Sequence, residues 1–263
     1  MTLNKQLDEL KNKEFQAPKK VLSLYLNTDL SQQSQQEGEW KIRLKNGLKR
    51  IQEYVENSGD KEELKQFKST RKAVENKIYE NEKSLSRSIV IFATADEEIW
   101  VAEKLPVPVE TEFYWESSPV TTQFQSLKKD YPFMAVVLIQ KNEAAVLETE
   151  WGILMDKSRY TLDLNTNDWR EHQGPQGDDL TRGGSKKDEF DDRLEANRNR
   201  WFKQLVSKIE KKAGNRNWEK LFLVGEKDEV ENLKSHFSKT IDKTIPRNLL
   251  NRKDQDILSE VLG

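Results

Sequence analysis

The stretch of sequence that decides the fold covers residues 172–215 and reads HQGPQGDDLTRGGSKKDEFDDRLEANRNRWFKQLVSKIEKKAGN. Its first third is polar and rich in glycine, a residue that adopts backbone conformations that other residues avoid. From Lys187 onward, charged residues alternate with regularly spaced apolar ones. We therefore predict a glycine loop over residues 172–187 that leads into a long helix over residues 187–213.

Apolar residues mark one face of this predicted helix. Counted from Phe190 to Ile209, these apolar residues are four, seven, four and four positions apart, a spacing that fits a single buried stripe. The step of seven passes over the polar Asn197, which leaves a local gap in the stripe. Gly214 is a typical helix stop, so we expect the helix to end just before it. The apolar positions are Phe190, Leu194, Trp201, Leu205 and Ile209.

The predicted helix belongs to a second domain, which we expect to span residues 131–263. Its first segment, FMAVVLIQ at residues 133–140, is strongly apolar and typical of a buried strand. Strands that then alternate with helices favour a mixed sheet flanked by helices. We predict further extended segments over residues 143–148, 151–164, 220–225 and 244–250, and helices over residues 229–237 and 254–262.

We expect a first domain of mixed α and β structure over residues 1–130. The segment KVLSLYLN at residues 20–27 alternates apolar and polar residues as a strand does, and SIVIFAT at residues 88–94 resembles a buried strand. The acidic turn ADEE links that second segment to another strand over residues 99–105. Helices are predicted over residues 3–14, 40–55 and 61–83. The whole chain is therefore predicted to be an α/β protein.

Composition limits the classes of protein to consider. The chain has 263 residues, of which 35% are hydrophobic and 34% charged, so a core is possible beneath a highly charged surface. A net charge of −2 gives no global case for binding nucleic acid, and DNA is not an expected partner. The absence of cysteine excludes disulfides and thiolate chemistry. No signal peptide or membrane span is visible, so we expect a cytoplasmic protein that does not bind a membrane.

Most catalytic motifs are missing. The chain has two histidines, His172 and His236, and no G-x-S-x-G turn, P-loop, HExxH or dinucleotide-binding fingerprint. Acidic residues cluster at 188–192, where they could bind a cation, but carboxylates at a helix start also complement the helix dipole. We expect neither a metal nor another cofactor.

Local charge gives the positive evidence for binding. Residues 182–220 contain twelve Lys and Arg against seven Asp and Glu, an excess of five positive charges in a chain whose net charge is −2. A basic helix behind a glycine loop suits contact with RNA phosphates, which would make binding sensitive to salt. The alternative is a helix whose charges only face solvent.

The order of these elements resembles the central domain of archaeal and eukaryotic class-one peptide-chain release factors and of the rescue factor Pelota. The resemblance rests on an apolar strand pair, a polar glycine loop, a long helix with an F-x-x-R-x-E-x-x-R-x-x-W pattern, and then KLFLVG. Segments of the first domain, including VLSLYLNTD at residues 21–29 and LPVPVE at residues 105–110, extend the likeness. The chain is identified as a member of the bacterial branch of this superfamily, in its tenth family.

This resemblance implies an RNase-H-like central domain and a loop that approaches RNA. Release factors carry Gly-Gly-Gln in the loop, whereas this chain has serine at the third position. Glutamine-dependent peptide release is therefore not expected, and Gln173, Gln176 and Ser185 are the candidates for any catalytic role. The expected RNA-binding loop is Arg182, Gly183, Gly184, Ser185, Lys186 and Lys187, and the expected RNA-binding helix positions are Arg193, Arg198, Arg200 and Lys203.

Three functions follow from this sequence. The first is a translation-associated factor that binds the ribosome or tRNA in rescue, quality control or dormancy. The second is a peptidyl-tRNA hydrolase with a rearranged loop, and the third is a protein-interaction adaptor that kept the fold. The third domain that binds a partner GTPase in larger relatives is not visible, so no GTPase partner is expected.

Overall fold

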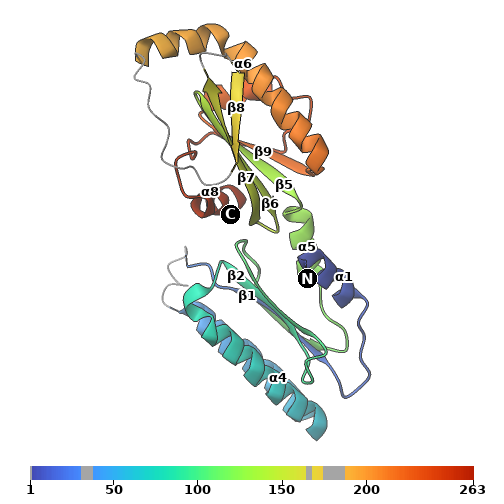
Figure 1. The fold of residues 1–263 in the computed structure, drawn as a ribbon. Helices are drawn as coiled ribbons and strands as arrows, with labels where there is room; N and C mark the ends of the chain where they lie inside the picture. Colours follow the sequence, from blue (N-terminus) through green and yellow to red (C-terminus); the bar gives the residue numbers. More distant parts are fainter. Residues whose placement is uncertain (1, 31–37, 164–167, 174–186) are drawn as a thin grey trace. The chain divides into compact units, whose positions relative to one another are not determined.

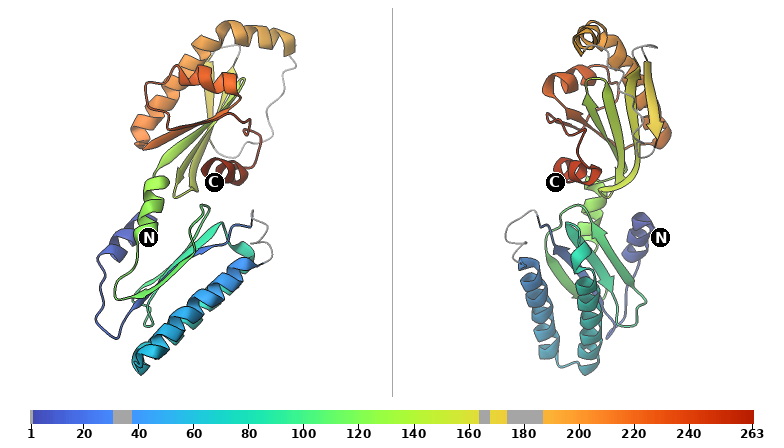
Figure 2. Two further views of the ribbon diagram at one scale, coloured as in Figure 1. Left: turned by 180° about the vertical axis from the view of Figure 1, so that it is seen from behind. Right: turned by 60° about the vertical axis from the view of Figure 1, so that its left-hand side comes forward.

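The structure is a computed structural model that describes residues 2–30, 38–163, 168–173 and 187–263. The chain divides into two compact units, Met1–Asp130 and Tyr131–Leu262, which are coloured blue to green and green to red in Figures 1 and 2. Within the described residues, every helix is too short or too polar to cross a membrane.

The first unit is built on a four-stranded antiparallel sheet. Its strand order is β3-β2-β1-β4, and β1 is the central strand that pairs with both β2 and β4. Alternating apolar side chains of β1 and β2 pack against two long helices, α3 and α4, which lie side by side on one face of this sheet (Figure 2). The bounds are β1 Val21–Asn27, β2 Ser88–Ala93, β3 Trp100–Leu105, β4 Glu112–Glu116, α3 Glu39–Ser58 and α4 Lys61–Glu80, with a short 3-10 helix at Glu82–Ser84.

The remaining side chains of β1 and β2 are also buried. Tyr25 and Phe92 stack edge to face with ring centroids 5.8 Å apart, and Phe92 contacts Phe124 of α5 (Thr122–Asp130). The Tyr25 hydroxyl donates a hydrogen bond to the carbonyl of Val120, 2.8 Å away. The N-terminal helix α1 (Leu3–Lys11) contacts α5. The two central strands of the first sheet, β1 and β2, are therefore buried on both faces.

The second unit contains a six-stranded mixed sheet. Its order is β10-β9-β5-β6-β7-β8, in which β10, β9 and β5 are parallel and β5 to β8 form an antiparallel meander. The helices α6 and α7 pack on one face, and α8 packs on the other (Figure 1). The bounds are β5 Met134–Gln140, β6 Glu143–Glu150, β7 Ile153–Asp163, β8 Asp168–Gln173, β9 Lys220–Gly225, β10 Lys243–Ile245, α6 Lys187–Arg216, α7 Lys227–Lys234 and α8 Asp254–Leu262. Helices on both faces of a mixed sheet confirm the predicted α/β class.

Two sequence predictions near α6 are wrong in detail. The glycine loop does not begin at His172, because His172 and Gln173 belong to strand β8 and pair with Arg159 and Ser158 of β7. Of the five side chains of β8 whose burial is described, only that of Trp169 is buried. An edge strand with a single inward apolar residue has too weak an alternation to be recognised from sequence.

The predicted stop of α6 at Gly214 is also wrong, because the helix continues to Arg216. A Cβ atom built on Gly214 meets no heavy atom within 4 Å. Gly225, by contrast, lies where a Cβ would come within 2.6 Å of the carbonyl oxygen of Ile139 in the neighbouring strand. Gly214 destabilises the helix without being required by its surroundings, whereas Gly225 permits the close packing of two strands.

These two glycines should respond to alanine in opposite directions. We expect Gly214→Ala to raise the free energy of unfolding by about 0.5–1 kcal/mol, because alanine restricts the unfolded chain and favours helix. We expect Gly225→Ala to lower it by about 1–3 kcal/mol through the clash with backbone. Urea denaturation followed by circular dichroism measures both, and a stabilising Gly225→Ala would contradict this packing.

Candidate functional site

The predicted loop lies largely outside the described residues. Gln176 and the loop positions Arg182, Gly183, Gly184, Ser185 and Lys186 all belong to residues 174–186, for which no geometry is described. Gln173 lies at the end of β8, and Lys187, Arg193 and Arg198 lie in α6. The side chains of these four residues are likewise outside the description, so their predicted roles remain predictions.

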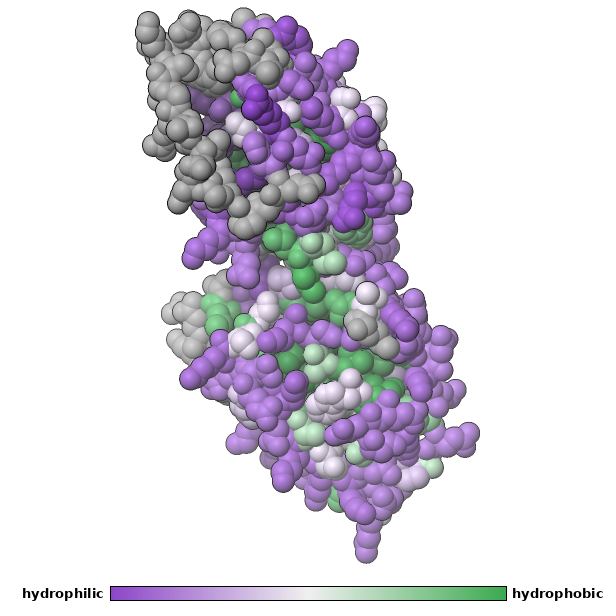
Figure 3. Space-filling view, viewed as in Figure 1, coloured by the Kyte–Doolittle hydropathy of each residue, from purple (hydrophilic) through white to green (hydrophobic). Residues whose placement is uncertain are grey.

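The second half of α6 is described in full and carries exposed cations. Arg200 and Lys203 were predicted to be RNA-binding, and both are exposed, as is Lys211 further along the helix. Spacings of three and eight residues place the three on one side of the helix. No ion pair within the described residues neutralises them. The visible described surface along α6 is strongly hydrophilic (Figure 3).

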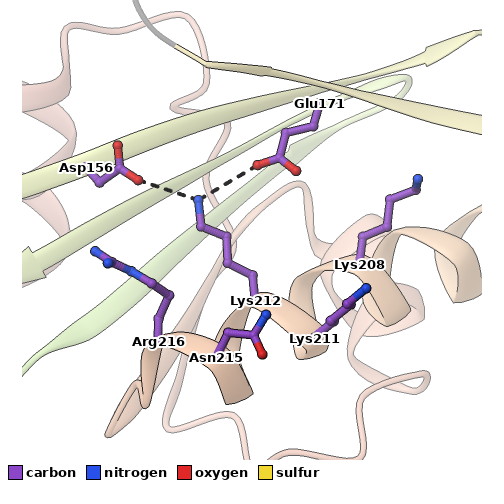
Figure 4. Close-up of a pocket in the computed structure, with 7 residues that line it drawn as sticks. All are labelled: Asp156, Glu171, Lys208, Lys211, Lys212, Asn215 and Arg216. Carbon is purple, nitrogen blue, oxygen red and sulfur yellow. Dashed lines mark ion pairs between the residues drawn. The ribbon is translucent and has the colours of Figure 1, made fainter.

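Beside these cations, the C-terminal part of α6 forms one wall of a pocket of about 550 Å³. The opposite wall comes from β7 and β8, which contribute one carboxylate each, Asp156 and Glu171 (Figure 4). The pocket therefore joins a basic helix face to two acids on an edge of the sheet. The remaining lining residues are Lys208, Lys211, Lys212, Asn215 and Arg216.

Lys212 is the link between the two walls. Its ammonium nitrogen lies 3.7 Å from an oxygen of Asp156 and 3.9 Å from one of Glu171, and these contacts are the dashed lines of Figure 4. It also donates a hydrogen bond to Ser158 Oγ at 2.8 Å. Only 16% of its side chain is exposed. Lys212 therefore serves mainly to hold α6 against β7 and β8, and little of its charge is available to a ligand.

A fully buried carboxylate, Glu148 of β6, anchors the end of α6 under this pocket. Arg216 donates hydrogen bonds to one Glu148 oxygen through Nη2 at 2.7 Å and Nε at 3.0 Å. Trp218 Nε1 donates to the other oxygen at 3.0 Å. The hydrogen bond to Glu148 also raises the pKa of Arg216 above its ordinary value. A buried carboxylate must be paired in this way, because its desolvation is otherwise costly.

The arrangement supports binding rather than nucleophilic catalysis. Ser158 and Lys212 are as close as a serine and its base would be, but Ser158 is only 1% exposed, so a substrate cannot reach its hydroxyl. Burial raises the pKa of Tyr160, which keeps its phenol protonated at neutral pH. The described residues contain no group of three or more His, Cys, Asp or Glu able to hold a metal ion.

Comparison with known proteins places this chain in a family. The model of bacterial archaeo-eukaryotic release factor family 5 matches residues 132–263, which is half of the chain. The chain belongs to this family. Across 262 residues it is also 32% identical to the uncharacterized protein YocB of Bacillus subtilis (strain 168), covering 100% of this chain and 99% of that protein.

Two solved structures are more distantly similar to this family 5 protein. An archaeal protein is 14% identical, with 99% of this chain and 72% of that chain covered and a TM-score of 0.33. The crystal structure of the archaeal translation termination factor aRF1 is 13% identical, with coverage of 98% and 72% and a TM-score of 0.33. The release-factor resemblance read from the sequence is confirmed at the level of the family, whereas the matching model is that of family 5 and not the tenth. The resemblance to Pelota stays a prediction.

The acidic half of the site was not predicted from the sequence. Glu148, Asp156 and Glu171 were not singled out, although Glu148 directly follows the apolar run AAVL of the predicted segment EAAVLE, which was a usable signal for a buried pair. Asp156 and Glu171 gave no such signal, because exposed acids on strands are common. Lys208, Lys211, Lys212 and Arg216 were counted among the basic residues, but their common pocket depends on the pairing of β7 with β8.

The anchoring role of Glu148 gives a stability prediction. Glu148→Gln keeps the shape but removes the charge, so we expect it to lower the free energy of unfolding by about 1–3 kcal/mol, the usual range for a charged hydrogen bond. The matched control is Glu219→Gln, an exposed carboxylate nearby, which should change stability by less than about 0.5 kcal/mol. Equal urea midpoints for the two variants would remove Glu148 from this role.

Proposed function

We propose that this family 5 protein is a translation-associated factor that binds RNA of the ribosome or of tRNA. The observation that carries the proposal is the exposed basic side of α6, within the unit that matches the release-factor family. Arg200, Lys203 and Lys211 are within reach of solvent and unpaired among the described residues, which is the condition for contacting phosphates.

The proposal extends to the glycine loop that precedes α6 in the sequence. Arg182 and Lys186 would add cations, as would Lys187 at the start of α6, and Gly183 and Gly184 would let the backbone approach a crowded site. Because serine follows the two glycines, the proposed role is binding during rescue, quality control or dormancy rather than glutamine-dependent release. Such a role would place the protein in the cytoplasm.

The proposed architecture of the binding unit is an RNase-H-like central domain. A four-stranded antiparallel meander, β5 to β8, continued by two strands that run parallel to β5, with helices on both faces, supports that assignment. In this arrangement the sheet supplies a rigid base, and α6 carries the cations along one side. Sites built on rigid helices and strands hold their side chains more accurately than loops do.

Ribosome co-sedimentation tests the proposed function. We expect the wild-type protein to migrate with ribosomes at low salt and to dissociate as salt rises, because phosphate contacts release counterions. Reversing two charges in Arg200→Glu/Lys203→Glu should weaken binding by about tenfold or more and lower the salt slope by about two.

The matched control reverses two exposed lysines elsewhere in the same unit, Lys227→Glu/Lys253→Glu, and should co-sediment like the wild type. The proposal fails if the wild-type protein stays at the top of the gradient with vacant, stalled and starved-cell ribosomes alike. It also fails if the control and the α6 variant lose binding equally.

A further inference from the structure

We infer that the pocket between α6 and strands β7 and β8 binds one ribose–phosphate unit, and that its two carboxylates make it select RNA over DNA. This inference rests on the proposed function and assigns the ligand of one part of the surface. The cations of the pocket would hold a phosphate. One of the two carboxylates, Asp156 or Glu171, would accept the single hydrogen bond that the 2′-hydroxyl group donates.

The basic wall has donors available for an anion. Lys211 has no ion pair within the described residues, and the one printed contact of Lys208 is a 3.4 Å approach to Asp168, with 38% of its side chain exposed. Arg216 uses Nε and Nη2 on Glu148, which leaves Nη1 for a ligand. Asn215, which lies between Lys211 and Arg216 in the sequence of α6, adds a side-chain amide. These side chains offer ammonium, amide and guanidinium donors, the kinds of group that bind phosphate oxygens.

The acidic wall favours a ligand that carries a hydrogen-bond donor as well as a phosphate. Asp156 and Glu171 are 49% and 40% exposed and face the cations across the same pocket (Figure 4). Their contacts with Lys212 are 3.7 and 3.9 Å, longer than a charge-assisted hydrogen bond of about 2.8 Å. Each carboxylate therefore keeps acceptor capacity for another donor.

A ligand that satisfies both walls must carry an anion and a hydroxyl donor close together. A ribose–phosphate unit does so, and the 2′-hydroxyl is the group that distinguishes RNA from DNA. The pocket volume of about 550 Å³ lies within the range of small-molecule sites and suits a single nucleotide unit. For a ligand that is only a phosphate, two exposed carboxylates would be unfavourable neighbours, because they repel the anion.

The decisive experiment measures binding of the full-length protein to single-stranded RNA and to a 2′-deoxy strand with the same bases, uracil included, by fluorescence anisotropy. We expect the wild type to bind the RNA about tenfold more tightly, as for one hydrogen bond to a charged group. In Asp156→Asn/Glu171→Gln, we expect the RNA preference to fall to about twofold or less.

The change in the ratio of RNA to DNA affinity distinguishes selection of RNA by the carboxylates from simple repulsion of phosphate. If the carboxylates only repel phosphate, the double variant will bind RNA and DNA more tightly by the same factor and keep the ratio of the wild type, which would overturn the inference. The control Glu231→Gln/Asp256→Asn removes two exposed carboxylates outside the pocket and should leave the ratio unchanged. Thermal melting of both variants confirms that they are folded.

The outcomes also distinguish this inference from the proposed function. A wild-type protein that binds both strands equally well, while still co-sedimenting with ribosomes, would overturn the pocket assignment and leave the translation role intact. A protein that binds neither strand and does not co-sediment would overturn both.

Discussion

The buried carboxylate of Glu148 is the constraint on which the binding face of the second unit depends. It lies on a central strand with no exposure to solvent, so it requires donors, and Arg216 and Trp218 supply them from the end of α6 and the turn that follows. This pairing fixes the position of the C-terminal end of α6 relative to β6. Because Lys208, Lys211 and Lys212 precede Arg216 by no more than eight residues of the same helix, the same anchor determines where their charges lie.

Two kinds of charge are combined on this face. Exposed cations on the outer side of α6 suit a sequence-independent attraction to phosphate, whereas the pocket offers both donors and acceptors at fixed positions. The first provides affinity and the second can provide selectivity. Membership of release factor family 5 makes RNA the natural partner to test, and the serine after the paired glycines makes binding a better hypothesis than peptide release.

Most helices and strands could be predicted from the sequence, because their apolar periodicity was strong. FMAVVLIQ, KLFLVG and the stripe of Trp201, Leu205 and Ile209 all led to correct elements. Strand β8 could not be predicted, since its pairing with β7 places charged residues on an exposed edge. The extension of α6 past Gly214 depends on Arg216 reaching a buried carboxylate 68 residues earlier. The pocket depends on two strands and a helix coming together, which no local pattern encodes.

The most direct test of this account is photo-crosslinking of the protein to 4-thiouridine-labelled RNA, with the crosslinked peptides identified by mass spectrometry. The account predicts crosslinks between residues 200 and 216 of α6 and on the facing strands β7 and β8, with few elsewhere in the described residues. Crosslinks confined to the first unit, for example to the lysines and arginines of α3, would contradict it.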